Sequence, residues 1–293
     1  MLQSSSVVKV IPERIESESL SDRVHINKIS KKLRRLVGKA IADYQMIKDG
    51  DRIMVCVSGG KDSFTLLETL ISLRRNAPVD FSLVAVNLDQ GHPGFPKTVL
   101  PKYFKEKNVE FEIIEEDTYS ITQQLTPKGK IQCPICSRLR RGILYTCAQK
   151  MGVSKIALGH HMDDVVETLF LNMFYGGTMK SMPPFLISDD GRNQVIRPLY
   201  YVRESLIKQY STLIEHPIIP CNLCGNQEQL QRRAVKKMIQ SWDTSNPGRV
   251  ESIARAIRNV KPSHLGDTGL YKFGKGRSSA DQTQIQTSTL LSD

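Results

Sequence analysis

The sequence has no long apolar run, so it contains no candidate membrane span. Its first 20 residues hold one short apolar stretch, Val7 to Ile11, which Lys9 interrupts, and this pattern argues against a secretory signal or a transit peptide. Cysteine is also scarce, with 6 residues in 293, which argues against a disulfide framework. We therefore expect a cytoplasmic protein with no membrane partner, whose cysteines act as thiols or as metal ligands.

Acidic residues are in the minority, because 41 lysines and arginines face 30 aspartates and glutamates, a formal net charge of +11. A surface this basic favours an anionic partner, with nucleic acid as the first candidate. A solubilising surface is the alternative explanation of the same excess. The charge supports a nucleic-acid partner without establishing one.

Internal repeats are absent, and the pattern of the chain changes near residue 200. Residues 1–25 and 274–293 are polar and poorly patterned, which predicts disordered tails. Within 26–200, strand-like and helix-like stretches alternate, which predicts an α/β domain with a mostly parallel sheet and helices on both faces. Residues 201–273 show helical patterns and predict a smaller helical C-terminal part.

The individual elements follow from the spacing of apolar residues. The expected strands are 52–57, 81–88, 109–114 and 155–158, and the expected helices are 64–75, 97–107, 138–151, 163–174, 203–214, 227–242 and 248–259. Sheets of this kind bind ligands beyond the carboxyl ends of their strands, so the chemistry is expected there.

A glycine-rich hexapeptide, Ser58-Gly59-Gly60-Lys61-Asp62-Ser63, follows the first expected strand. Adjacent glycines let the backbone approach a ligand closely, and the free N–H groups of a helix N-terminus favour an anion such as phosphate. Lys61 adds a cation, and Ser58 and Ser63 add hydroxyl donors. The alternative is a tight turn with Ser63 as the helix N-cap. The spacing of a Walker loop is missing.

A second polar cluster, GHHMDDVVET, follows the strand expected at 155–158. Asp163, Asp164 and Glu167 place carboxylates at the start of a helix, where they suit Mg²⁺ bound to phosphates or complement the helix dipole. His160 and His161 form a pair at the end of the strand, which favours a site. Asp89 is expected at the same sheet edge, either as a nucleotide or metal contact or as a turn residue.

Four of the six cysteines form two CxxC pairs in expected loops, Cys133 with Cys136 and Cys221 with Cys224. A structural zinc site with four cysteines is one interpretation, although the 84 residues between the pairs exceed the usual spacing of fewer than about 20. An iron–sulfur cluster is the other, because it also uses thiolates and tolerates a distant ligand.

Two further groups of residues bear on these interpretations. Cys56 on a strand and Cys147 on a helix are expected to be packed thiols. Arg138, Arg140 and Arg141 follow the first pair and are candidate contacts to an RNA backbone, with a solvated helix face as the alternative. The basic run at 31–35 has the same two interpretations.

Together these motifs resemble those of a known family. Residues 58–63 resemble the SGGxDS pyrophosphate loop of PP-loop ATP pyrophosphatases, and 159–168 resemble the GHxxDDxxET signature of their tRNA-modifying branch. With CxxCSRLRRG at 133–142, NMFYGG at 172–177 and PCNLCG at 220–225, the chain from 29 to 273 is similar to the tRNA 2-thiocytidine synthetases.

The resemblance implies an adenine-nucleotide alpha hydrolase-like PP-loop fold and ATP- and Mg²⁺-dependent thiolation of cytidine 32 in tRNA. It implies a [4Fe-4S] cluster on Cys133, Cys136 and one cysteine of the second pair, with Cys224 favoured and Cys221 as the alternative. It further implies a cysteine desulfurase as sulfur source and allows a homodimer. The implied catalytic residues are Lys61, Asp163 and Asp164, and the implied ATP contacts are Ser58, Gly59, Gly60, Lys61, Asp62, Ser63, Asp89 and His160.

Two other functions remain open from the sequence. A PP-loop ligase or amidotransferase would use a nitrogen nucleophile and keep the cysteines for structural zinc. A non-catalytic RNA-binding module would leave the glycine turn without a nucleotide. Release of pyrophosphate from ATP in the presence of tRNA would exclude the second.

Overall fold

The computed structural model describes residues 20–126, 133–219 and 227–274. The chain divides into two compact units after Val250. The first unit contains the sheet and the residues of interest, and the second contains the short 3₁₀ helix η2 (Pro262–His264). Within the described ranges, no helix is long and apolar enough to cross a membrane.

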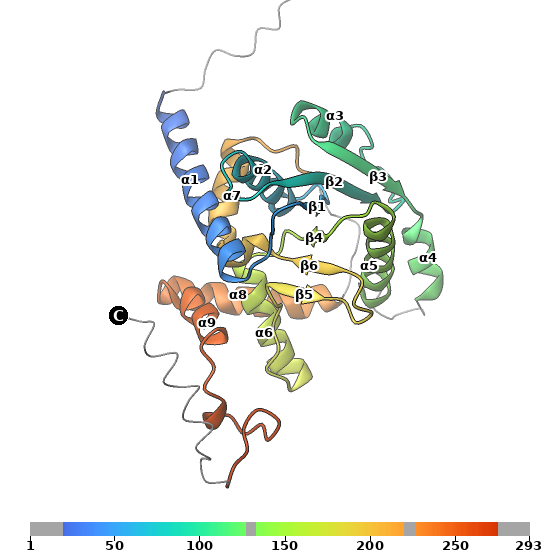
Figure 1. Ribbon diagram of the computed structural model, residues 1–293. Helices are drawn as coiled ribbons and strands as arrows, with labels where there is room; N and C mark the ends of the chain where they lie inside the picture. Colours follow the sequence, from blue (N-terminus) through green and yellow to red (C-terminus); the bar gives the residue numbers. More distant parts are fainter. Residues whose placement is uncertain (1–19, 127–132, 220–226, 275–293) are drawn as a thin grey trace, which may run out of the picture. The chain divides into compact units, whose positions relative to one another are not determined.

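A six-stranded sheet runs through the first unit in the order β3-β2-β1-β4-β6-β5 (Figure 1). The strands are β1 (Asp51–Cys56), β2 (Phe81–Asp89), β3 (Glu110–Glu115), β4 (Lys155–Ala157), β5 (Phe185–Ile187) and β6 (Gln194–Ile196). The pairings of β3, β2, β1, β4 and β6 are all parallel, and β5 pairs antiparallel with β6. The strand order reverses between β1 and β4, which is where such sheets bind their ligands.

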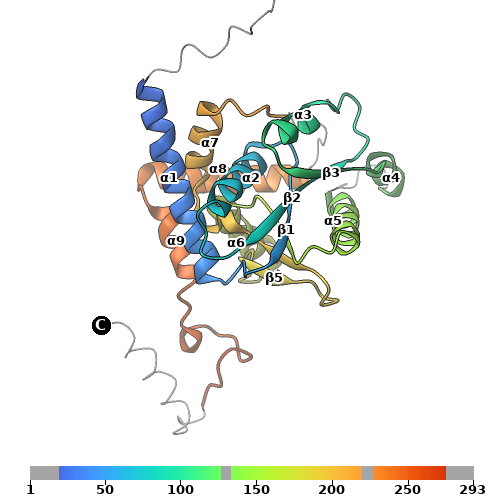
Figure 2. The same ribbon diagram turned by 45° about the horizontal axis from the view of Figure 1, so that its top comes forward.

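Helices cover both faces of this sheet, with α5 on one face and α1, α2 and α7 on the other (Figures 1 and 2). The helices are α1 (Leu20–Asp43), α2 (Lys61–Arg74), α3 (Val99–Glu106), α4 (Thr118–Leu125), α5 (Cys133–Lys150), α6 (Met162–Gly176), α7 (Glu204–Leu213), α8 (Gln227–Ser245) and α9 (Arg249–Ile257), with the 3₁₀ helix η1 (Pro198–Tyr201) before α7. The predicted α/β architecture is confirmed.

The core follows from the alternation of side chains along the strands. Met54 of β1 packs with Val84 of β2, Ile156 of β4 and Ala148 of α5, and each of these side chains is at most 2% exposed. Ile53, the neighbour of Met54 in β1, is fully buried and points to the opposite face. A strand buried on both faces accounts for the continuous apolar run in β1.

The expected strands and helices all occur, and most of their ends shift by three residues or fewer. The largest shift corrects an expectation: α5 begins at Cys133, so the first cysteine pair lies in the first turn of a helix rather than in a loop. Pro134 suits such a turn, because its missing N–H group needs no partner there. The division into a domain of 26–200 and a helical part of 201–273 stays a prediction.

One largely buried carboxylate, Glu68 of α2, connects α2 to α3, to α7 and to the turn after α7. It accepts hydrogen bonds from the hydroxyls of Tyr103 (2.8 Å) and Tyr210 (2.7 Å). Lys107 Nζ lies 2.5 Å from Glu68, and Nε2 of the buried His216 lies 3.4 Å away. Burial alone would raise the pKa of Glu68, but these partners hold it at about 2.

The lowered pKa predicts how acid affects stability. Because the folded pKa of Glu68 lies below the ordinary value of 4.5, its contribution is complete above pH 4.5 and is lost as the pH falls toward 2. In urea unfolding, we expect Glu68 to account for a loss of about 2 kcal/mol in unfolding free energy between pH 5 and pH 3.

Glu68→Gln should reduce this pH dependence, whereas Glu106→Gln, which changes an exposed carboxylate on α3, should keep that of the wild type. Equal pH dependence in Glu68→Gln and the wild type would contradict the role of Glu68.

Candidate active site

The glycine turn connects β1 directly to α2. Gly59 has a φ of +85°, in the left-handed region that favours glycine, and Gly60 is the N-cap of α2. Ser63 is therefore not the N-cap; its hydroxyl donates to the Gly60 carbonyl (2.8 Å) and lies 3.5 Å from the hydroxyl of Ser58. The turn presents the N-terminus of α2 at the carboxyl end of β1, an arrangement that favours phosphate.

Two other segments approach this turn closely. The backbone N–H of Ile219 donates to the Gly59 carbonyl (2.9 Å), and a Cβ on Gly59 would lie 2.8 Å from Ile219 Cδ1. A Cβ on Gly159, after β4, would lie 3.2 Å from the backbone of Asp62 and Ser63. The positive φ and the Ile219 side chain favour glycine at 59, and a Cβ at 159 would require the backbone of Asp62 and Ser63 to shift.

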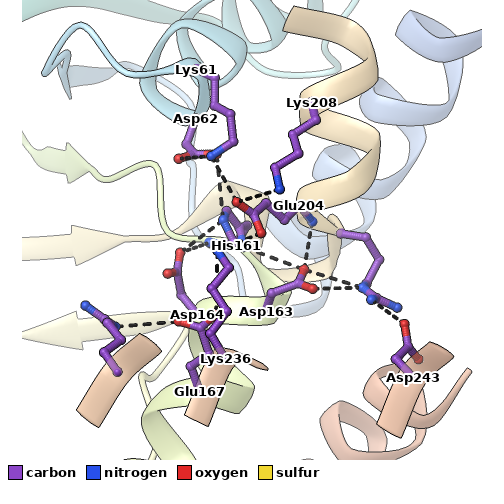
Figure 3. A network of polar contacts seen from close by, with 12 residues as sticks. Lys61, Asp62, His161, Asp163, Asp164, Glu167, Glu204, Lys208, Lys236 and Asp243 are labelled. Carbon is purple, nitrogen blue, oxygen red and sulfur yellow. Dashed lines mark hydrogen bonds and ion pairs between the residues drawn. The ribbon is translucent and has the colours of Figure 1, made fainter. Parts of the chain in front are cut away.

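Charged side chains from α2, α6, α7 and α8 form a network beside the turn (Figure 3). Lys61 Nζ lies 3.2 Å from Asp62 Oδ2 and 3.1 Å from Glu204 Oε1, and Lys236 Nζ lies 2.8 Å from Glu204 Oε2. Burial acts to raise the pKa of Glu204, but Lys236 and Lys61 hold it at about 2. Burial acts to lower the pKa of Lys61, but the charges of Asp62 and Glu204 raise it. Lys61 and Glu204 are therefore a charged pair at neutral pH.

Asp163, in the first turn of α6, connects that helix to α7. Its Oδ2 accepts the backbone N–H of Glu204 (2.7 Å), and its Oδ1 accepts a hydrogen bond from Arg203 Nε (3.2 Å). Arg203 also binds Asp243 of α8 through Nη2 (2.8 Å). These contacts give Asp163 a structural function in addition to the predicted catalytic one.

Asp164 lies next to His160 and His161, whose Nδ1 atoms have no hydrogen-bond partner among the described residues. Its Oδ2 accepts the backbone N–H of the buried His161 (3.0 Å) and lies 3.4 Å from His161 Nε2, which is 3.7 Å from Asp62 Oδ1. Burial is the main cause that lowers the pKa of His160, in the loop between β4 and α6, to about 4. His160 is therefore neutral at physiological pH.

Glu167 is the buried carboxyl of α6. Its oxygens lie 3.5 Å from Arg232 Nε and 3.8 Å from Lys236 Nζ, both on α8. Burial outweighs these charges and raises the pKa of Glu167 to about 7. A carboxyl with a pKa in this range suits proton exchange near neutral pH.

The donors and acceptors of the site fit a nucleotide polyphosphate. Among the described residues, Asp62 Oδ1, His160 Nδ1, His161 Nδ1 and Thr168 Oγ1 are buried without a hydrogen-bond partner. Buried polar atoms in this state are rare without a ligand or water. The described part of the chain shows no cluster of three or more His, Cys, Asp or Glu arranged as a metal site. Mg²⁺ needs only one or two carboxylates plus phosphates, and Asp62 Oδ1 fits that function.

The first cysteine pair lies near the end of β2. Cys136 Sγ donates to Gln90 Oε1 (3.4 Å), and Gln90 directly follows β2. Asp89, the last residue of β2, is buried; its Oδ1 accepts the Gly91 N–H (3.0 Å), and its Oδ2 lies 3.7 Å from Lys97 Nζ. Because β1 and β2 are parallel neighbours, Cys136 and the glycine turn lie at the same sheet edge.

The other cysteines fall into two groups. Cys56 and Cys147 pack against the core cluster on the α5 face of the sheet, and burial raises the pKa of Cys56 to about 12, as expected for packed thiols. The side chain of Cys133 and the whole of Cys221 and Cys224 lie outside the described residues, so the cluster ligands stay a prediction.

The three arginines after Cys136, namely Arg138, Arg140 and Arg141, are exposed on α5. The basic run at 31–35 lies on α1, where Leu33 is buried in the core. RNA binding by either cluster stays a prediction.

Sequence analysis did not assign four residues to this site, namely Arg203, Glu204, Ile219 and Asp243. Arg203 and Glu204 lie 40 and 41 residues along the chain from Asp163 of α6, which they bind. Asp243 lies 40 residues from its partner Arg203, and Ile219 contacts Gly59 at the other end of the domain sequence. No recognisable spacing links residues so far apart, and only the fold brings them together.

Comparisons with known proteins agree with this geometry. The PP-loop domain family matches residues 26–218. The tRNA-cytidine(32) 2-sulfurtransferase of Marinobacter nauticus is 57% identical and covers 94% of this chain and 92% of its own length. The tRNA-cytidine(32) 2-sulfurtransferase of Vibrio vulnificus is 59% identical and covers 89% of this chain and 84% of its own length. A solved structure, the U34-tRNA thiolase NcsA from Methanococcus maripaludis with its [4Fe-4S] cluster, has a TM-score of 0.65 at 21% identity over 81% of each chain, which supports the fold.

The contacts of Asp163 predict a loss of stability in Asp163→Ala. The variant leaves the N–H of Glu204 and the guanidinium of Arg203 without this acceptor, which should lower the unfolding free energy by about 2 kcal/mol. Urea unfolding at pH 7 measures this, with Asp189→Ala, at an exposed position, as control. If both variants are as stable as the wild type, the contacts of Asp163 do not stabilise the fold.

Proposed function

The chain belongs to the PP-loop family of tRNA-cytidine(32) 2-sulfurtransferases, and on that premise we propose that it replaces the 2-oxygen of cytidine 32 in tRNA with sulfur in an ATP-dependent reaction. The observation that supports this most is the shared sheet edge. A phosphate-binding turn at the end of β1 and Cys136 beside the end of β2 lie on one side of the sheet, so both could act on one base.

In the first half-reaction, the 2-oxygen of cytidine attacks the α-phosphorus of ATP. A bond forms between this oxygen and the α-phosphorus. The bond between the α-phosphorus and the oxygen that bridges the α- and β-phosphates breaks, and pyrophosphate leaves. The N–H groups of the turn bind the departing phosphates. Lys61 leaves its ion pair with Glu204 and pairs with these phosphates instead, so that it neutralises the negative charge that develops on them. Mg²⁺ at Asp62 adds to that neutralisation when it is bound.

In the second half-reaction, a sulfur nucleophile attacks C2, the carbon–sulfur bond forms and AMP departs with the original oxygen. Cys136 and Cys133, with Cys224 or alternatively Cys221, are the residues that would hold a [4Fe-4S] cluster. Such a cluster, when bound by three cysteines, supplies an iron with an open position for sulfide. The proposal includes a cysteine desulfurase as sulfur source, a homodimer, and the cytoplasm as compartment, where thiols stay reduced.

The basic residues of α5 suit the RNA substrate. Arg138, Arg140 and Arg141 are exposed and follow Cys136 within five residues. RNA phosphates bound by these arginines would bring the RNA close to Cys136. Proteins reach unstacked bases most readily in single-stranded loops, which agrees with a target in the anticodon loop.

Lys61→Ala tests the ATP half-reaction. We expect tRNA-dependent release of pyrophosphate to fall by roughly 10²–10³-fold, because the variant loses a cation aimed at developing charge. A coupled pyrophosphate assay measures this, and Lys102→Ala, at an exposed position on α3, is the control. Unchanged release by Lys61→Ala would overturn the assignment of the glycine turn.

Cys136→Ala tests the sulfur half-reaction. The variant should bind ATP and tRNA like the wild type yet form no 2-thiocytidine, measured by mass spectrometry of digested tRNA after reaction with ATP and sulfide. Cys147→Ala, which alters a packed thiol on the same helix, should keep thiolation within about threefold. Wild-type thiolation by Cys136→Ala would exclude a function of this thiol in sulfur transfer.

A further inference from the structure

The segment after α7 returns along α2 toward the glycine turn. Its buried His216 lies 3.4 Å from Glu68 in the middle of α2, and its imidazole ring lies 5.3 Å from the ring of Phe64 in the first turns of α2. Three residues later, Ile219 contacts Gly59, just before α2 begins. The segment 216–219 is therefore fixed at two points, to α2 itself and to the glycine turn that precedes it.

The contact between Ile219 and Gly59 has a backbone part and a side-chain part. The Ile219 N–H donates to the Gly59 carbonyl (2.9 Å), and three Ile219 side-chain atoms lie within 3.0 Å of where a Gly59 Cβ would be. In a trans peptide, the C=O of one residue and the N–H of the next point in opposite directions. A hydrogen bond that fixes the Gly59 carbonyl therefore also fixes the direction of the Gly60 N–H, a donor that phosphate would use.

We infer that Ile219 is a positioning residue for ATP, because it holds the Gly59–Gly60 peptide in the orientation that binds phosphate. Its side chain covers one side of Gly59, and its N–H fixes the carbonyl of this residue. Cys221 follows Ile219 by two residues in the sequence, so the segment that supplies the second cysteine pair also shapes the ATP turn.

The inference deepens the proposed function and rests on it. Nucleotide binding and sulfur delivery must meet at one carbon atom, and reacting groups that are misplaced by an ångström lose much of their rate. Coupling between two sites is reciprocal for binding. Because Cys221 follows Ile219 by two residues in the sequence, we expect nucleotide at the turn to change the alkylation rate of Cys221, and loss of the Ile219 contact to remove that change.

The test compares four variants of the full-length chain, handled without oxygen. Ile219→Ala removes the side-chain contact, Ile219→Val retains most of it, and Ile219→Pro removes the N–H donor. Ile218→Ala is the matched control, because the side chain of Ile218 is 46% exposed and its N–H donates to His216 rather than to the turn.

Two readouts separate positioning from general damage. Isothermal titration with α,β-methylene-ATP gives the Kd for nucleotide, and titration with tRNA gives the Kd for RNA. Mass spectrometry of peptides after iodoacetamide treatment gives the alkylation rate of Cys221 with and without the nucleotide analogue.

We expect Ile219→Ala and Ile219→Pro to raise the Kd for the analogue by about tenfold or more, a loss comparable to one hydrogen bond. The Kd for tRNA should stay within about twofold, since the turn contacts nucleotide. Ile219→Val and Ile218→Ala should have wild-type Kd values for both the analogue and tRNA. The analogue should change Cys221 alkylation by at least about threefold in the wild type, and not in Ile219→Ala.

Wild-type analogue affinity in both Ile219→Ala and Ile219→Pro would overturn the inference and leave the proposed function intact. An equal loss of analogue and tRNA binding would also overturn it, because that result indicates general damage. If the wild type itself does not bind the analogue, the proposed function fails, and the inference fails with it.

Discussion

The positive φ of Gly59 directs the chain from β1 into α2 so that the N-terminus of α2 faces the carboxyl edge of the sheet. The rest of the site depends on this turn. A residue with a Cβ at Gly59 would be strained and would collide with Ile219, and one at Gly159 would press on the backbone of Asp62. Strand order reverses between β1 and β4, so the loop after β4 lies beside the glycine turn that follows β1.

The charged side chains around the turn form ion pairs with one another. Lys61 pairs with Glu204, and Lys236 pairs with the same carboxylate and lies near Glu167. A polyphosphate that enters must compete with Glu204 for Lys61, which favours ligands of high negative charge over monoanions. Hydrogen bonds and charge from Lys236 and Lys61 hold the pKa of Glu204 at about 2, whereas burial and the nearby carboxylates of Asp164 and Glu204 raise the pKa of Glu167 to about 7.

The sequence predicts the parts of this structure that depend on local pattern. Buried strands and amphipathic helices have a clear period, and the motifs at 58–63 and 159–168 place their residues at the ends of β1 and β4. β5 and β6 have three residues each, too few to show a period, and no motif follows either of them as residues 159–168 follow β4. The first cysteine pair belongs to a helix because α5 begins at Cys133, before its apolar pattern starts. Glu204 and Ile219 reach the site through folding of distant segments, which no local pattern encodes.

The proposed sulfur transfer depends on a [4Fe-4S] cluster held by Cys133, Cys136 and one cysteine of the second pair, and the metal content of the protein is the most direct test of that proposal. The protein, purified without oxygen, should contain about four iron and about four acid-labile sulfide per chain, with visible absorption that bleaches in air. Zinc without sulfide, even after anaerobic reconstitution, would contradict the account. The ATP chemistry would then stand with a nitrogen nucleophile and a structural metal.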